Sequence, residues 1–138
     1  EEYSNDITKG KFVSQSILAN TVAHQGDKIT IVYSLGKEPT TEEKNALKKA
    51  ETYSNSLHMS KQGIYNQLTS SIEGFTKEAA QYAIDNIEAD WNKNALEKAK
   101  TYQTSMNMSS KAIYNQLVSS VEGFTKSEAQ YAIDNLDK

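Results

Sequence analysis

An internal duplication constrains the fold of this 138-residue chain more than any other feature. Residues 44–89 align with residues 93–138 at a constant offset of about 49, and about 30 of the 46 aligned positions are identical. The shared stretches include IYNQL, EGFTK and QYAIDN, each present once in either copy. This degree of identity indicates two copies of one supersecondary unit that stack against each other.

Each copy has the capping residues and apolar spacing of three helices. Thr40, with Glu43 three residues later, predicts a capping box at the start of the first helix, directly after Pro39. Thr125 and Glu128 predict a second capping box in the second copy. The remaining predicted N-caps are Ser60 and Thr76 in the first copy and Ser109 in the second.

Helical spacing also predicts which residues are buried. The predicted stripes are Ala46, Ala50, Tyr53 and Leu57, repeated as Ala95, Ala99, Tyr102 and Met106; Ile64 and Leu68, with Tyr65 beside them; and Ala80, Ala83, Ile84 and Ile87. Gly74 suits a left-handed C′ position that ends the second helix. Phe75 precedes the third helix and is expected to pack on Ala80 as a hydrophobic staple.

The junction between the copies contains neither glycine nor proline from residue 87 to residue 94. The third helix of the first copy is therefore expected to run almost directly into the first helix of the second copy. Trp91 lies in this junction and is expected to pack between the two copies.

The first 38 residues have a different pattern. Residues 11–16 and 28–34 are rich in Thr, Val and Ile and predict two strands joined by a turn. Ile29, Ile31 and Tyr33 alternate with polar or smaller residues, which predicts a half-covered sheet. We therefore expect a mainly α fold: a short β-hairpin segment (1–38) followed by two three-helix repeats with helix-turn-helix character (39–89 and 90–138).

Composition excludes several classes of site. The chain has no cysteine, all fifteen of its basic residues are lysine, and its formal net charge is −3. Disulfides, cysteine-ligated metals and bidentate guanidinium recognition are therefore excluded. No apolar run approaches the roughly 18 residues of a membrane span, so we expect membrane placement only through an anchor outside this sequence.

Residues suited to catalysis are scarce. His24 and His58 are the only residues of the type best suited to act as a base near neutral pH, and Asn107 replaces His58 in the second copy. Residues 90–94 resemble the start of a calcium loop, but Ala95 stands where that loop requires glycine. We therefore expect a binding module, not an enzyme, with no cofactor and no metal.

A helix-turn-helix shape raises the alternative of DNA binding. The third helix offers Lys77, Gln81 and Asn86 to a base edge, but Glu78, Asp85 and Glu88 accompany them. Because these acids oppose the approach of phosphates, nucleic acid is a disfavoured partner.

The repeat pattern resembles a known family. Its Met-Ser, Ile-Tyr-x-Gln-Leu, Glu-Gly-Phe-Thr and Ala-Ile-Asp-Asn motifs, over residues 42–138, are similar to those of the host cell-surface-exposed lipoprotein repeat. That family occurs in Gram-positive bacteria and their temperate phages, and its members are usually tethered by an N-terminal lipid. Some members act in superinfection exclusion, stopping the DNA of a second phage from entering the host. The resemblance implies a cell-surface location and a phage tail or tape-measure protein as partner.

Residues 10–36 resemble the C-terminal half of a PASTA domain, which implies association with peptidoglycan. The matching residues are Gly10, Val13, Ser14, Gln15, Ser16, Thr21, Gly26, Ile29, Ile31, Ser34 and Gly36. Ile17 and Asn20 depart from the proline and glycine that this pattern usually contains. A peptidoglycan-associated structural module is therefore the alternative to a phage-excluding one.

Tyrosines at the edge of the buried stripes are the best candidates for partner contacts. Tyr82 and Tyr131 combine a large apolar ring with a polar tip, which suits an interface anchor. The polar pairs beside the second helices, Asn66 with Gln67 and Asn115 with Gln116, are the other candidates.

Overall fold

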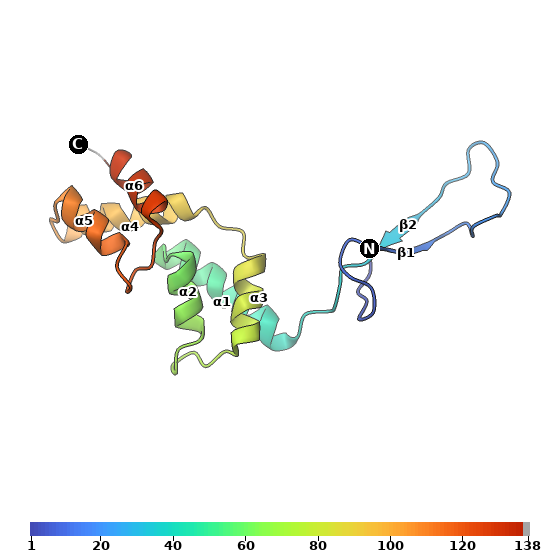
Figure 1. Ribbon diagram of the computed structural model, residues 1–138, viewed down its shortest axis with the longest axis horizontal. Helices are drawn as coiled ribbons and strands as arrows, with labels where there is room; N and C mark the ends of the chain where they lie inside the picture. Colours follow the sequence, from blue (N-terminus) through green and yellow to red (C-terminus); the bar gives the residue numbers. More distant parts are fainter. Residues whose placement is uncertain (137–138) are drawn as a thin grey trace. The chain divides into compact units, whose positions relative to one another are not determined.

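The computed structural model describes residues 1–136, which divide into two compact units between Thr40 and Thr41. Within the described residues, the first unit contains two strands and the second contains six helices (Figure 1). The predicted mainly α fold with an N-terminal hairpin is confirmed.

The helices fall into two sets of three. The first repeat consists of α1 (Thr41–Leu57), α2 (Lys61–Leu68) and α3 (Lys77–Asn86). The second consists of α4 (Trp91–Ser105), α5 (Ser110–Leu117) and α6 (Lys126–Asp134). Each set has its own buried cluster, so the duplication in the sequence corresponds to two hydrophobic cores.

Side chains cap the short helices as predicted. The hydroxyls of Ser60 and Thr76 accept the backbone N–H groups of Gly63 and Ala79. Ser109 and Thr125 cap the corresponding helices of the second repeat, and the predicted capping box of Thr125 and Glu128 is present.

In the first repeat Ala79 occupies the position equivalent to Glu128 and has no carboxylate to complete such a box. Glu42 of α1 replaces it, accepting the backbone N–H of Thr76 at 2.9 Å. A contact between two helices therefore satisfies the donor that a local contact satisfies in the second repeat.

The buried stripes agree with the prediction except at their C-terminal ends. Ala46, Ala50, Ile64, Leu68, Ala80, Ala83 and Ile84 form the first core together with Ala79, and Ala95, Ala99, Tyr102, Ile113 and Leu117 belong to the second. Tyr53, Tyr65, Phe75 and Ile87 are partly buried against the first core.

The prediction that Leu57 and Met106 are buried is wrong, since they are 50% and 62% exposed. In α1 the buried stripe continues from Ala50 to Ser54, which is covered by a contact from the second repeat. Met106 lies beyond the last residue of α4, as its C-cap, so helical spacing no longer determines where its side chain lies.

Gly74 adopts the predicted left-handed conformation, with φ of 68°, but the prediction that it ends α2 as its C′ residue is wrong. The helix ends at Leu68 because the run of Thr69, Ser70 and the following serine favours turns over helix. Gly74 instead closes a separate turn, donating its N–H to the carbonyl of Ser70 at 2.8 Å. We call residues 70–74 and 119–123 the repeat turns.

The third helix was expected to run almost directly into the next, but an extended segment separates α3, which ends at Asn86, from α4, which begins at Trp91. Ile87 is extended, with ψ of 132°, and Asp90 caps a new helix by accepting the N–H of Lys93 at 3.0 Å. A capping carboxylate therefore starts α4 in a segment that lacks glycine and proline. The prediction for Trp91 is confirmed: it is the first residue of α4 yet packs against the first repeat's core.

The first unit is a two-stranded antiparallel hairpin of β1 (Phe12–Gln15) and β2 (Ile31–Tyr33), with an irregular register between Phe12 and Ser14. The strands lie within the predicted segments. The expectation that Ile29, Ile31 and Tyr33 share a covered face is wrong, because all three are exposed. The two strands and the loop of residues 16–30 that joins them supply no second layer to cover that face.

Candidate protein-binding surface

The same polar cluster fixes the repeat turn in both copies. In the first repeat the hydroxyl of Tyr53 donates to the Glu73 carboxylate, and Lys49 Nζ lies 3.3 Å from Glu73 Oε1. In the second repeat Tyr102 donates to Glu122, and Lys98 Nζ lies 3.8 Å from Glu122 Oε2. The long first helix of each repeat thereby holds the turn that precedes its third helix.

The protonation states of these groups follow from their contacts. The hydrogen bond from Tyr53 is the main cause that lowers the pKa of Glu73, and Lys49 contributes in the same direction. Burial, followed by the hydrogen bond to Glu122, raises the pKa of Tyr102 to about 12. Glu73 therefore remains ionised at physiological pH and can accept its hydrogen bond, and Tyr102 remains neutral and can donate one.

Two of the predicted contact residues take part in this cluster. Gln67 hydrogen bonds with the side chain of Tyr53, and Gln116 does so with Tyr102. Both glutamines are half-buried. Each glutamine therefore binds a tyrosine of its own repeat. Helical spacing alone could not distinguish such a position from one that is open to a partner.

The paired asparagines lie further out. Asn66 is exposed, and its Oδ1 accepts the side-chain amide of Gln62 at 2.8 Å. Asn115, its equivalent on α5, is also exposed. These two side chains are accessible to a partner, whereas the neighbouring glutamines face the polar cluster.

The two candidate tyrosines lie on α3 and α6. Tyr82 is half-buried, and Tyr131 is 42% exposed. Their backbone carbonyls accept the side-chain amides of Asn86 and Asn135, both at 2.8 Å. The two repeats therefore present a partly exposed tyrosine at the same position, in the same local setting.

Sequence reasoning missed two pairs of exposed apolar residues. Ile72 and Val121, at the tips of the repeat turns, are 85% and 77% exposed. Leu57 and Met106, whose exposure is given above, form the other pair. Comparing the two copies would have identified them, because each pair keeps an apolar character while the residue changes. Exposed apolar groups repeated at equivalent positions suit contacts with another protein.

A cavity of about 250 Å³ lies between α2 and α3. It is lined by Lys61, Gln62, Tyr65, Gln81 and Ile84. Its lining joins an apolar floor to three polar side chains, a composition that can hold a side chain of a protein partner.

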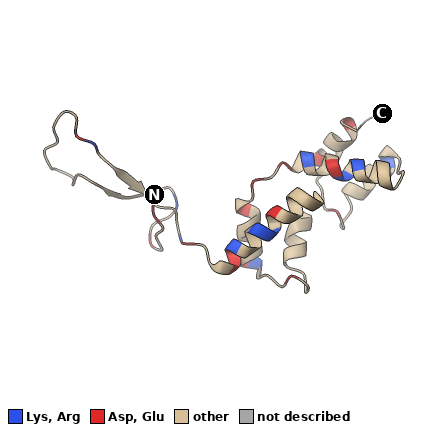
Figure 2. Ribbon diagram, turned by 180° about the vertical axis from the view of Figure 1, so that it is seen from behind, with Lys and Arg blue, Asp and Glu red and all other residues tan. Residues whose placement is uncertain are grey.

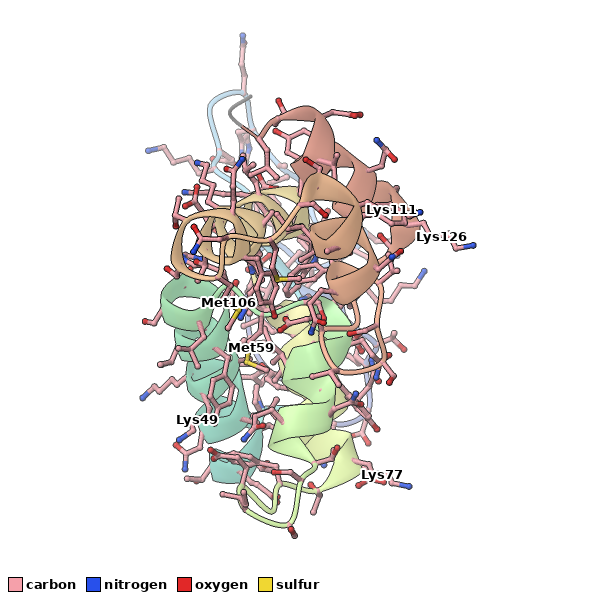
Figure 3. All side chains as sticks on the ribbon, turned by 90° about the vertical axis from the view of Figure 1, so that its left-hand side faces the viewer. Lys49, Met59, Lys77, Met106, Lys111 and Lys126 are labelled. Atoms are coloured by element: carbon pink, nitrogen blue, oxygen red, sulfur yellow. The ribbon has the colours of Figure 1, made fainter. Side chains whose placement is uncertain are left out.

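Charge is mixed over the helices. Lysines and acidic residues are interspersed along α1 and α4 (Figure 2), and Lys77 and Lys126 extend outward from the ends of their helices (Figure 3). Among residues 1–136, no group of three or more His, Asp or Glu side chains is placed to hold a metal ion. No helix in that same range has the length and apolar character needed to cross a membrane.

The family model described as "host cell surface-exposed lipoprotein" matches the chain twice, over residues 41–87 and 90–136. The chain belongs to this family. The two matches coincide with the two three-helix repeats, so the family's characteristic unit is the repeat. The resemblance seen in the repeat motifs and the cell-surface location that it implied are confirmed.

A solved structure supports the same assignment. The chain is similar to Ltp, a superinfection exclusion protein from the Streptococcus thermophilus temperate phage TP-J34, with 43% sequence identity and a TM-score of 0.66. The match covers 72% of this chain and 100% of that chain. No curated protein matches the chain significantly.

Proposed function

We propose that this chain is a surface-tethered binding module that blocks the entry of phage DNA, as in superinfection exclusion. The observation that carries this proposal is the similarity to Ltp, which covers 100% of the solved chain of that superinfection exclusion protein. Membership of a cell-surface family is consistent with it, because DNA of an incoming phage crosses that surface.

Binding, without catalysis, is the proposed mode of action. The proposed contact surface combines Tyr82 and Tyr131 with the exposed apolar residues Ile72 and Val121, and large apolar groups of this kind suit contacts with another protein. The module binds an incoming phage protein and so prevents the step of DNA entry that this protein would perform next. A tether raises the local concentration of the module at the surface where that protein arrives.

The proposed partner is a phage tail protein, and most specifically the tape-measure protein. An elongated helical partner can present two similar sites, and the two repeats offer the same tyrosine at the same place on α3 and α6. Engaging both sites at once strengthens binding without any new type of contact.

A pull-down with the purified chain tests the choice of partner. Separate arms contain phage tail proteins, including the tape-measure protein, and purified cell wall. We expect retention of a tail protein and its loss in the double variant Tyr82→Ala, Tyr131→Ala. Tyr3→Ala, which removes an exposed tyrosine outside the repeats, serves as the matched control and should bind as the unchanged chain does.

Retention by cell wall alone would instead favour the peptidoglycan-associated alternative that the PASTA-like pattern suggests. Equal retention of the tail protein by the double variant would refute the tyrosine anchors. Far-UV circular dichroism of each variant establishes that the helices are intact, so that lost binding reflects the surface.

A further inference from the structure

The two repeats are identical at about 30 of 46 aligned positions, but equivalent residues have different surroundings at the junction. Ser60, the N-cap of α2, is 1% exposed, whereas its equivalent Ser109 is exposed. Asn94 near the start of α4 is buried, whereas its equivalent Asn45 on α1 is exposed. The difference arises because one end of the first repeat receives the second.

The first junction contact involves the N-terminus of α2 and the second repeat's turn. Ser60 Oγ accepts the N–H of Gly63 at 2.9 Å and donates to the backbone carbonyl of Glu122. A Cβ at Gly63 would lie 3.3 Å from that carbonyl oxygen, and a Cβ at Gly123 would lie 3.2 Å from Ser60 Oγ. The two backbones therefore approach closely where both residues are glycine.

The second junction contact involves the end of α1 and the start of α4. The side-chain amide of Asn94 donates to Ser54 Oγ at 2.8 Å and to the backbone carbonyl of Met59 at 3.0 Å. Ser54 is 2% exposed, so this pair of hydrogen bonds is shielded from water.

Two of the first-repeat residues at the junction differ between the copies. Ser54 corresponds to Gln103, and Gly63 corresponds to Ala112. In both cases the first repeat carries the smaller residue. The larger residues fit the same fold in the second repeat, where no further repeat docks against them within residues 1–136.

We propose that Ser54 and Gly63 are positioning residues that lock the second repeat onto the first in one orientation. The lock makes the pair of repeats a rigid body, so the two copies of the contact surface stand at a fixed spacing. It also makes the two repeats non-equivalent: the first can receive another repeat at this face, whereas Gln103 and Ala112 do not admit the same contact at the equivalent face of the second. This proposal concerns the junction itself and stands independently of the proposed partner.

Exchanging residues between the repeats tests the lock. The test pair is Ser54→Gln with Gly63→Ala, and the matched control is Gln103→Ser with Ala112→Gly. Each change introduces a residue that the same position of the other repeat already accommodates. The helices of each repeat should therefore form in both variants, as checked by far-UV circular dichroism.

The readout is the distance between the repeats. The chain has no cysteine, so spin labels attached at Glu51→Cys on α1 and Ser105→Cys on α4, both exposed positions, give one defined pair. Double electron–electron resonance should show one narrow distance distribution for the otherwise unchanged chain and for the control. The test pair should change it to a broad distribution.

An unchanged narrow distribution in the test pair would overturn the proposal, and so would equal broadening in the control. Ser60→Ala provides a separate check, because it removes the hydroxyl that donates to Glu122 while adding no atoms. It should also broaden the distribution, and a narrow distribution there would contradict the assigned role of that hydrogen bond.

Discussion

Tyr102 donates its hydroxyl hydrogen to the carboxylate of Glu122, and the same pairing joins Tyr53 to Glu73 in the first repeat. Glu122 has a second role, since its backbone carbonyl accepts the hydroxyl of Ser60 from the other repeat. The residue that fixes the turn within the second repeat therefore also contacts the first. Changes at Glu122 should therefore affect both the stability of the second repeat and its contact with the first.

Removing the Tyr102 hydroxyl should destabilise the fold. Tyr102→Phe leaves the ring in place but deprives Glu122 of its neutral donor, and hydrogen bonds to charged groups contribute about 1.5–3 kcal/mol. We expect the free energy of unfolding in urea to fall by about 1–2 kcal/mol. Tyr131→Phe, which alters an exposed ring on α6, should leave it nearly unchanged; equal losses in both variants would contradict the assignment.

Stability should fall at high pH through the same residue. The pKa of Tyr102 is raised from 10.0 to about 12, so the folded state favours the neutral phenol. This stabilisation is fully present below pH 10 and is lost as the pH rises through about 12. Urea unfolding across that interval should show a steeper decline in the unchanged chain than in Tyr102→Phe. Parallel pH profiles would contradict the raised pKa.

The two turn glycines should differ in their tolerance of alanine. Both are left-handed, with φ of 68° at Gly74 and 70° at Gly123, which costs any residue with a Cβ about 1–2 kcal/mol. A Cβ at Gly74 meets open space, whereas one at Gly123 meets Gln62 Cβ and Ser60 Oγ, both at 3.2 Å.

Gly123→Ala should therefore lower the urea midpoint more than Gly74→Ala does. The two variants are matched in sequence context, so their difference isolates the junction. Equal urea midpoints would show that the second repeat's turn is not in close contact with the start of α2.

Trp91 should report on both repeats at once. It is the only tryptophan in the chain, belongs to α4 of the second repeat, and packs on the core of the first. Because it joins the two, its fluorescence should change in the same urea transition as the far-UV circular dichroism. A fluorescence transition at clearly lower urea would mean that the repeats separate before either unfolds.

The sequence was sufficient to predict features that depend on neighbouring residues. The helix starts at Ser60, Thr76, Ser109 and Thr125 follow from a hydroxyl that reaches a donor three residues away. The buried alanines follow from helical spacing. The left-handed conformation of the glycines follows from the absence of a Cβ. The sequence did not predict that these glycines belong to a separate turn after the second helix.

Features that depend on the other repeat could not be predicted from spacing. Nothing in helical periodicity distinguishes Ser54 from Leu57 as the buried residue, because the cover comes from Asn94 in α4. Gln67 looked open for a related reason: its hydrogen bond with Tyr53 joins α2 to α1 within the first repeat, and spacing along one helix does not reveal a contact with another helix. Alternation in the hairpin predicted a covered face, but the unit has no second layer to supply the cover.

Phage plating tests the central claim most directly. Host cells would carry the chain with a membrane tether, the same chain secreted without one, or the tethered double variant Tyr82→Ala, Tyr131→Ala, all at matched expression. The account predicts that the tethered chain reduces plaque numbers strongly and that the other two forms protect much less. Equal plaque numbers for all three forms would contradict both the tether and the tyrosine surface, and no protection by the tethered chain against any tested phage would contradict exclusion itself.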